Sequence, residues 1–282
     1  MIINLENSEI KVLDKGFVRL VDCMPRLIPS GSEKLRCDYA IAEAARVSYG
    51  GETKSEQENI RLVRYLLKNK HTSPFEMVKF KFHLKLPIFV QRQLIRHRTA
   101  NVNEISGRYT QLNDEFYEPA VLRAQSKSNK QGSSSEPIEM TDELIEYYDK
   151  YMKTNDEIYK LYNTLVENGV AKELARICLP QNIYTELYWC MDLHNLLHFL
   201  DLRKSPHAQY EIREYANALE TLIGDVCPIT VAAYREYFVD SVTFSKKELK
   251  LVKSYMNNTE SHIGMFPTKR EENEFIEKMK LL

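Results

Sequence analysis

The run PIFVQRQLIRHR, residues 87–98, combines helical periodicity with a high density of hydrogen-bond donors. In a helix, Arg92 and Arg96 lie four residues apart on one face. Gln93 and His97 form a second pair with the same spacing. Guanidinium groups match phosphate oxygens in both charge and geometry. The run therefore predicts a site for a phosphorylated ligand.

The residues that follow, 99–110, lose this periodicity and predict a loop rich in polar groups. These groups belong to Asn101, Asn103, Glu104, Ser106, Gly107, Arg108 and Tyr109. Amide and hydroxyl groups can bind the edge of a base or a ribose, and Gly107 lets the backbone approach a ligand closely. Ser106 has no evident base partner, so it is interpreted as a ligand contact and not as a nucleophile. Charge clusters usually face solvent, but rigid donors at this density beside a glycine favour a binding site.

The same residues carry a family signature. Arg96, His97 and Arg98, followed after seven residues by Ser106, resemble the motif of flavin-dependent thymidylate synthases. Asn103, Glu104 and residues 106–109 resemble the extended form of that motif. Further resemblance lies in HTSPFE at 71–76, ARICLPQNIYT at 175–185 and LRKSPHAQYEIREYA at 202–216. Together these segments extend over most of residues 10–235.

The resemblance implies a fold and a reaction. The implied fold is α+β: a small, mostly antiparallel sheet packed with several long helices, in a homotetramer with active sites at the subunit interfaces. The implied reaction is the reductive methylation of dUMP to dTMP. Methylenetetrahydrofolate supplies the carbon, NADPH reduces FAD, and tetrahydrofolate is released. The cofactor carries the redox chemistry and the protein orients it.

Matching the family motifs position by position implies three sets of contacts. Contacts to dUMP fall on Gln93, Leu94, Ile95, Arg96, Glu104, Ile105, Ser106, Gly107, Arg108, Arg176 and Arg203. Contacts to FAD fall on Ser73, Arg96, His97, Arg98, Glu104, Asp192, Leu193, His194 and His198. His71 falls on the folate side.

Arg203 is the residue to which the resemblance assigns catalysis. Its guanidinium cannot act as a base, because its pKa lies above about 12. It can instead stabilise negative charge that builds on the carbonyl edge of uracil while C5 accepts the carbon.

Three positions depart from the familiar family pattern. Asp192 and His198 stand where amides are common, and Met77 stands where histidine is frequent. These departures leave open a related flavoenzyme that adds a different one-carbon group to a pyrimidine nucleotide. A second alternative is a non-enzymatic RNA-binding module that uses the arginine-rich run.

Composition argues against several broad classes. The net charge is -1 and the pI is about 6.7, which disfavours a general nucleic-acid coat or a polybasic membrane anchor. No apolar stretch approaches the roughly 18 residues of a membrane span, and no secretory signal is evident. The five cysteines are widely spaced without a CxxC, which is typical of reduced thiols in a cytoplasmic protein. The histidines at 194, 198 and 207 lack a matching carboxylate pattern, so no metal is expected.

Periodicity predicts the elements that must position these residues. Strands are predicted on both sides of Gly16 and over 78–86, where apolar and polar residues alternate. Helices are predicted at 38–48, 56–70, 87–98, 142–168, 170–178, 184–201 and 206–226, with Thr141 as an N-cap and Gly169 just past a helix end. The strands are thus expected to cluster in the first third of the chain.

Residues 1–240 are predicted to form one domain, with the Ser-rich segment 122–137 as a polar surface loop inserted in it. Residues 241–282 are predicted to be a charged extension with two amphipathic pieces, KKELKLVKSY and EENEFIEKMK.

Overall fold

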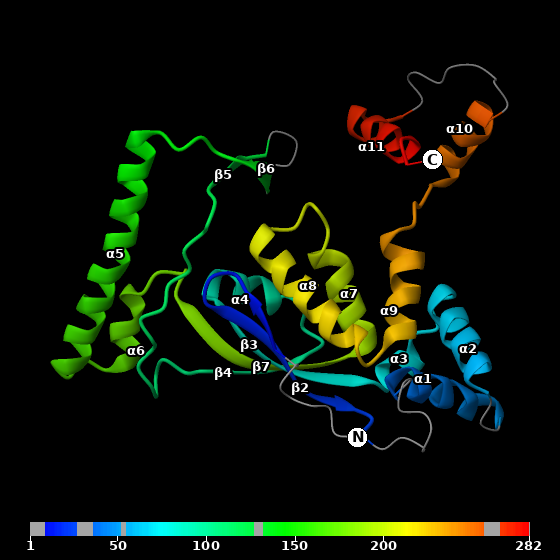
Figure 1. Cartoon of the computed structure of the whole chain (residues 1–282), viewed down its shortest axis with the longest axis horizontal. Coiled ribbons are helices and arrows are strands. Elements are labelled where there is room, and N and C mark those ends of the chain that lie inside the picture. The colour runs from blue at the N-terminus through cyan, green and yellow to red at the C-terminus, as the bar shows by residue number, and fades with distance from the viewer. Residues whose placement is uncertain (1–8, 27–35, 52–54, 127–131, 257–265, 282) are drawn as a thin grey trace. The chain divides into compact units, whose positions relative to one another are not determined.

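The computed structural model describes residues 9–26, 36–51, 55–126, 132–256 and 266–281. Contacts divide the chain into two compact units, Met1–Ala233 and Tyr234–Leu282, both traced in Figure 1. That residues 1–240 form a complete domain and the rest an extension stays a prediction.

The first unit is built on an antiparallel sheet with strand order β1-β2-β3-β7-β4. Its strands are β1 (Glu9–Val12), β2 (Gly16–Met24), β3 (Lys79–Pro87), β4 (Asn101–Glu104) and β7 (Tyr184–Asp192). One face is apolar, because alternate residues such as Val18, Phe82 and Trp189 are fully buried. The strands predicted around Gly16 and over 78–86 are confirmed, and so is the α+β class.

The central strand β7 lies where the sequence predicts the first half of a helix, so the predicted helix over 184–201 is wrong there. Leu187, Trp189 and Met191 are buried on one side of β7, and this period of two was hidden by the apolar helix that follows. The predicted loop over 99–110 is likewise wrong for β4, which pairs with β7. The strands are therefore not confined to the first third of the chain.

Helices cover the apolar face of the sheet (Figure 1). They are α4 (Ile88–Leu94), α7 (Leu193–Arg203) and α8 (Tyr210–Gly224); α8 packs on β1 and β2, α4 packs on β3 and β7, and α7 packs on α8. Beside them lie α1 (Arg36–Arg46), α2 (Glu56–Lys68), α3 (Ser73–Glu76) and α9 (Pro228–Tyr234). Asp38 of α1 caps the start of α9, since its carboxylate accepts from the backbone nitrogens of Ile229 and Thr230 at 2.9 and 3.0 Å.

The helix α4 is shorter than predicted. The backbone nitrogens of Arg96 and His97 donate to the oxygens three residues before them, at 3.3 and 3.1 Å, and this tighter turn ends the helix at Leu94. The predicted helical face shared by Arg92 and Arg96 is therefore wrong. Residues 96–98 lie between the end of α4 and β4, where the backbone changes from helical to extended.

The segment predicted as a polar loop, 122–137, contains a hairpin of β5 (Arg123–Gln125) and β6 (Ser133–Pro137). Its central residues, 127–131, lie outside the described residues. After the hairpin, α5 (Asp142–Glu167) begins at Thr141, whose hydroxyl accepts from Leu144 at 3.2 Å, and Gly169 has a φ of 83° just past its end. Both predicted helix boundaries are confirmed. The helix α6 (Lys172–Ala175) and a 3-10 turn (Arg176–Cys178) follow.

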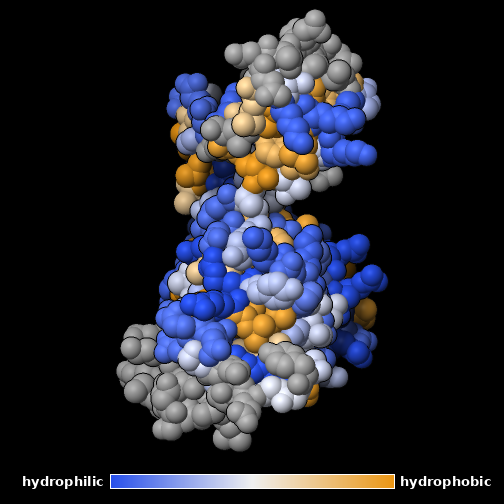
Figure 2. All heavy atoms as spheres, turned by 90° about the vertical axis from the view of Figure 1, so that its right-hand side faces the viewer, coloured by the Kyte–Doolittle hydropathy of each residue, from blue (hydrophilic) through white to orange (hydrophobic). Residues whose placement is uncertain are grey.

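The second unit contains α10 (Lys246–Met256) and α11 (Lys269–Met279), which confirms its two amphipathic pieces. Phe275 is buried between the rings of Phe244 and Phe266, with centroid distances of 6.5 and 5.3 Å. Glu248 and Lys278 join the two helices by an ion pair of 2.7 Å. Other apolar side chains of this unit, such as Leu249, remain exposed, and Figure 2 shows apolar patches among its hydrophilic side chains.

The sheet and α8 meet at Gly16, and this contact can be tested. A Cβ at Gly16 would lie 2.1 Å from Oη of Tyr215 and 2.7 Å from the backbone oxygen of Lys85. The Tyr215 hydroxyl already donates a hydrogen bond to that oxygen. We expect Gly16→Ala to lower the free energy of unfolding by about 2 kcal/mol or more, the usual cost of overpacking a core. Urea unfolding measures it.

The matched control is Gly224→Ala. An added Cβ there meets no atom within 4 Å, so its unfolding free energy should stay unchanged or rise by less than about 1 kcal/mol. Equal losses in the two variants would contradict the packing described for Gly16.

Candidate active site

Gln93, His97 and Arg203 form a first group of predicted site residues that the structure brings together. Nε of Arg203, at the end of α7, donates to Nε2 of His97 at 3.0 Å. Nη2 of Arg203 donates to the backbone oxygen of Gln93 at 3.2 Å. These two bonds fix the plane of the guanidinium. Within the described part of the chain, Nη1 of Arg203 has no hydrogen-bond partner and is available to a ligand.

His97 in this group is held neutral. Burial, followed by the charge of Arg203 and the nearby His198, lowers the pKa of His97 to about 4. Because Nε2 accepts from Arg203, the ring proton of neutral His97 resides on Nδ1. The ring also packs edge-on against Phe199, with a centroid distance of 4.7 Å. His97 can thus offer one N–H donor to a ligand.

Residues assigned to the flavin surround the start of α7. Asp192 is the N-cap of this helix and accepts from the backbone nitrogen of Asn195 at 2.9 Å, which accounts for a carboxylate at this position. Leu193 is fully buried and can offer a ligand only its backbone. His194 is half-buried, and His198 is exposed one turn later.

Other assigned residues lie on neighbouring turns. The helix α3 packs on α7 and begins with Ser73, which is exposed. His71 precedes it, exposed, with its ring edge-on to Tyr65 at 5.8 Å. Arg96 and Arg98 are exposed, and their side chains make no hydrogen bond or ion pair with the described residues. These two cations are therefore available to an anionic ligand.

A second group forms where β4 ends, from residues 106–108 and Arg176. The hydroxyl of Ser106 accepts from the backbone nitrogen of Arg108 at 3.3 Å, so the chain turns tightly there. Gly107 is buried under Arg176, whose Cδ would lie 3.1 Å from an added Cβ. Arg108 pairs with Glu173 at 3.2 Å, although both side chains are more than half exposed. The group presents two guanidiniums beside a glycine backbone. Within the described residues, no hydrogen bond or ion pair joins it to the first group.

Glu104 lies between the two groups and connects the elements that carry them. Its Oε1 accepts from Thr185 of β7 at 2.7 Å, and its Oε2 accepts from Gln91 of α4 at 2.9 Å. The carboxylate thus holds β4, β7 and α4 together in addition to any contact with a ligand.

Three more of the assigned positions are apolar. Leu94 is fully buried in the core and can offer only its backbone to dUMP, whereas Ile95 and Ile105 are exposed beside the polar groups.

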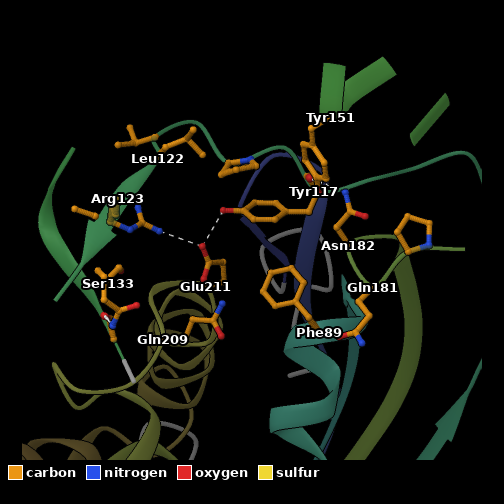
Figure 3. A pocket seen from close by; sticks show the side chains of 16 residues that line it. Phe89, Tyr117, Leu122, Arg123, Ser133, Tyr151, Gln181, Asn182, Gln209 and Glu211 are labelled. Atoms are coloured by element: carbon orange, nitrogen blue, oxygen red, sulfur yellow. Dashed lines mark hydrogen bonds and ion pairs between the residues drawn. The ribbon is translucent and has the colours of Figure 1, made fainter. Parts of the chain in front are cut away.

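Sequence reasoning missed the residues at the start of α8. Glu211 is buried there and accepts from Arg123 of β5 at 3.0 Å and from the Tyr117 hydroxyl at 3.1 Å. Figure 3 shows this cluster beside a hollow of about 680 Å³, which Phe89 and Gln209 also line. None of the predicted site residues lines the hollow, but Gln209 joins it to the first group, because the Gln93 amide donates to Oε1 of Gln209. The matched segment HAQYEIR contained both Gln209 and Glu211 and was the available signal.

Among the residues described, no three His, Cys, Asp or Glu side chains gather into a metal site. In the same part of the chain, none of the helices is both long and apolar enough to span a bilayer.

An α+β unit with arginines clustered at helix and strand ends is compatible with proteins that bind phosphorylated ligands. Comparisons with known proteins identify the family. A family model described as thymidylate synthase complementing protein matches residues 33–229. The chain is 49% identical over 280 residues to a flavin-dependent thymidylate synthase of Dictyostelium discoideum, with 97% of this chain and 87% of the relative covered. It is 50% identical over 247 residues to one of Thermus thermophilus, with 88% and 86% covered.

A solved structure agrees with this result. A UMP/dUMP methylase, PolB from Streptomyces cacaoi, bound with 5-Br dUMP, has a TM-score of 0.68 and 31% identity, covering 81% of this chain and 98% of that chain. The chain belongs to the flavin-dependent thymidylate synthase family, and it is an enzyme, a methyltransferase. The predicted family is confirmed, and the non-enzymatic RNA-binding alternative is set aside.

The neutral state of His97 predicts a pH dependence of stability. As pH falls from about 6.5 toward 4, unfolded chains take up a proton on His97 that the folded protein does not, so unfolding becomes more favourable. His97→Gln keeps an acceptor for Arg203 but does not titrate. We expect the melting temperature of the wild type to fall more between pH 7 and pH 4.5 than that of this variant. Parallel pH profiles would contradict the assignment.

Proposed function

We propose that this enzyme converts dUMP to dTMP, with methylenetetrahydrofolate as carbon donor and NADPH-reduced FAD as hydride source, and releases tetrahydrofolate. The observation that carries the proposal is the Arg203 guanidinium, held by His97 and Gln93 with Nη1 free for a ligand. A similar structure bound with 5-Br dUMP supports this choice of substrate.

In this proposal the second group binds the phosphate of dUMP. Arg108 and Arg176 supply positive charge, and Gly107, which has no side chain, lets Arg176 lie close against the turn. Ser106 acts as a hydrogen-bonding contact. Its hydroxyl lies in a tight turn, and no described base accepts its proton.

Arg203 acts on the pyrimidine ring. Its two intramolecular bonds hold the cation in place before the substrate arrives, so little reorganisation is needed when charge develops on a uracil carbonyl. Burial and the nearby charge of Arg96 lower the pKa of Arg203 below its usual value, yet the group stays cationic at neutral pH. Stabilising that carbonyl oxygen raises electron density at C5, where the carbon is added.

The residues near α7 fit an anionic, ring-bearing cofactor such as FAD. Arg96 and Arg98 are exposed cations without intrachain partners among the described residues, which suits the pyrophosphate. His97 offers Nδ1–H, and His194 and His198 add rings on the same side of the helix. When bound, the flavin supplies the hydride. His71 and the exposed Met77 would face the folate.

Within the described residues of one chain no hydrogen bond or ion pair joins the two groups, and a symmetric subunit interface can place groups from different copies side by side. We therefore propose a homotetramer in which the phosphate-binding group of one subunit completes the ring-binding group of another. Loss of activity on dilution to monomers, with recovery on concentration, would support it.

A second candidate is methylation of UMP, because the similar solved methylase is also found bound with 5-Br UMP, at 30% identity and a TM-score of 0.66. A third is transfer of a different one-carbon group. Incubation with dUMP or UMP, methylenetetrahydrofolate and NADPH, followed by mass analysis of the nucleotide, distinguishes them. The leading proposal requires that dUMP gains one methyl group and that FAD absorbance accompanies the protein.

Arg203→Ala tests the catalytic role. We expect kcat for dTMP formation to fall by at least about 100-fold, as for loss of a preorganised charge-stabilising donor, while FAD stays bound. Arg270→Ala removes a guanidinium that is 88% exposed in the second unit, and it should leave kcat unchanged. Loss of FAD from Arg203→Ala would contradict the separation of the two roles.

Gly107→Ala tests the phosphate group. The added Cβ would displace the Arg176 side chain, which can swing into solvent, so stability should change by less than about 1 kcal/mol. We expect the dissociation constant for dUMP to rise several-fold, about what one weakened charged contact costs. Nucleotide titration of the flavin fluorescence measures it, and unchanged affinity would exclude this turn as the phosphate site.

A further inference from the structure

Gln209 is anchored firmly although its side chain is exposed. Its backbone is the N-cap of α8, and its oxygen accepts from Arg213 at 3.2 Å. The first turn of α8 is held in turn by Glu211, which is paired with Arg123 and Tyr117. The Gln209 side chain takes no part in capping. It is therefore free to bond elsewhere from a fixed backbone position.

That bond goes to Gln93. Nε2 of Gln93 donates to Oε1 of Gln209, and the backbone oxygen of Gln93 accepts from Arg203. In the described structure, Oε1 of Gln93 accepts no hydrogen bond.

We infer that Gln209 is a positioning residue that holds the Gln93 amide with Oε1 turned to the pyrimidine ring, and thereby selects uracil over cytosine. The inference rests on the proposed function, in which Arg203 faces that ring. A carbonyl oxygen can only accept a hydrogen bond. Uracil presents the N3–H donor to it, whereas cytosine presents a bare N3 acceptor. Two acceptors that face each other leave a polar group unpaired, and such mismatches discriminate strongly.

Gln209 itself need not touch the nucleotide. It lies at the edge of the hollow seen in Figure 3, and it acts through the one amide that it orients. The role requires an acceptor at position 209. A carboxylate can replace it, and a thioether of similar size cannot, because it is a poor acceptor.

Equilibrium binding of dUMP and of dCMP to the FAD-loaded protein tests this role, with Gln209→Met, Gln209→Glu, Gln93→Met and the double variant Gln93→Met/Gln209→Met. We expect Gln209→Met to weaken dUMP binding about fivefold to tenfold, as for one lost hydrogen bond, and to reduce the preference for dUMP over dCMP. Gln209→Glu should retain that preference. On the Gln93→Met background, Gln209→Met should change dUMP affinity by less than about twofold, because the two residues act as one unit.

Three results would overturn the inference. One is a Gln209→Met protein that binds dUMP and dCMP as the wild type does. Another is an equal effect of Gln209→Met with and without Gln93, which would indicate a general structural role. The third is a Gln209→Glu protein that loses the preference for dUMP. In each case the wild type would still bind dUMP and form dTMP, so the proposed function would stand. A wild type that binds neither nucleotide would overturn both.

Discussion

The pairing of β7 with β3 on one side and β4 on the other is the constraint on which the site depends. It fixes where β4 ends, and so where the turn of residues 106–108 places Gly107 and Arg108. It also fixes where α7 begins, since Asp192 closes the strand and caps the helix. Arg203 lies at the far end of that helix. A shift of register in β7 would therefore move both groups of the candidate site at once.

The candidate site gathers positively charged side chains, and hydrogen bonds hold one of them, Arg203, in place. Arg203 is held between a backbone oxygen and a neutral imidazole, and neither acceptor cancels its charge. Arg96 and Arg98 remain exposed and make no ion pair with the described residues. At Arg203, Arg96 and Arg98 an anionic ligand can therefore meet a cation that is already placed, without separating an ion pair. Arg108 differs, because it pairs with Glu173. Glu104 places a negative charge among these cations. Its carboxylate accepts hydrogen bonds from Thr185 and Gln91 and so joins β4, β7 and α4.

Two neutral amides, Gln209 and Gln93, are joined by a hydrogen bond that orients the Gln93 side chain. Gln209 and Gln93 form a chain that begins at the capped end of α8 and reaches the guanidinium of Arg203. An amide has a donor end and an acceptor end, so the partner of one end decides what the other presents. In the proposed role of Gln209, the start of α8, tied to the β5–β6 hairpin by Arg123 and Glu211, supports the residues that bind the nucleotide. The hairpin would then act on the candidate site indirectly, because none of the predicted ligand contacts lies on it.

The sequence by itself determined the family and the residue types of the site, because the spacing of Arg96, His97, Arg98 and Ser106 can be recognised along the chain. It also determined β3, in which apolar and polar residues alternate, and the boundaries of α5. There the Thr141 hydroxyl caps the first turn and Gly169 adopts a positive φ just past the end. These features depend on neighbours within a few residues.

Only the tertiary structure decided the rest. Residues 184–192 are a strand because β3 and β4 offer hydrogen-bond partners from distant parts of the chain, which local propensity cannot register. The helix α4 stops at Leu94 because the chain must extend into β4. The bonds of Arg203 to His97 and of Gln93 to Gln209 join residues more than a hundred positions apart. Which arginine is fixed, which histidine is neutral and which amide is oriented are properties of such contacts, and they exist only once the chain is folded.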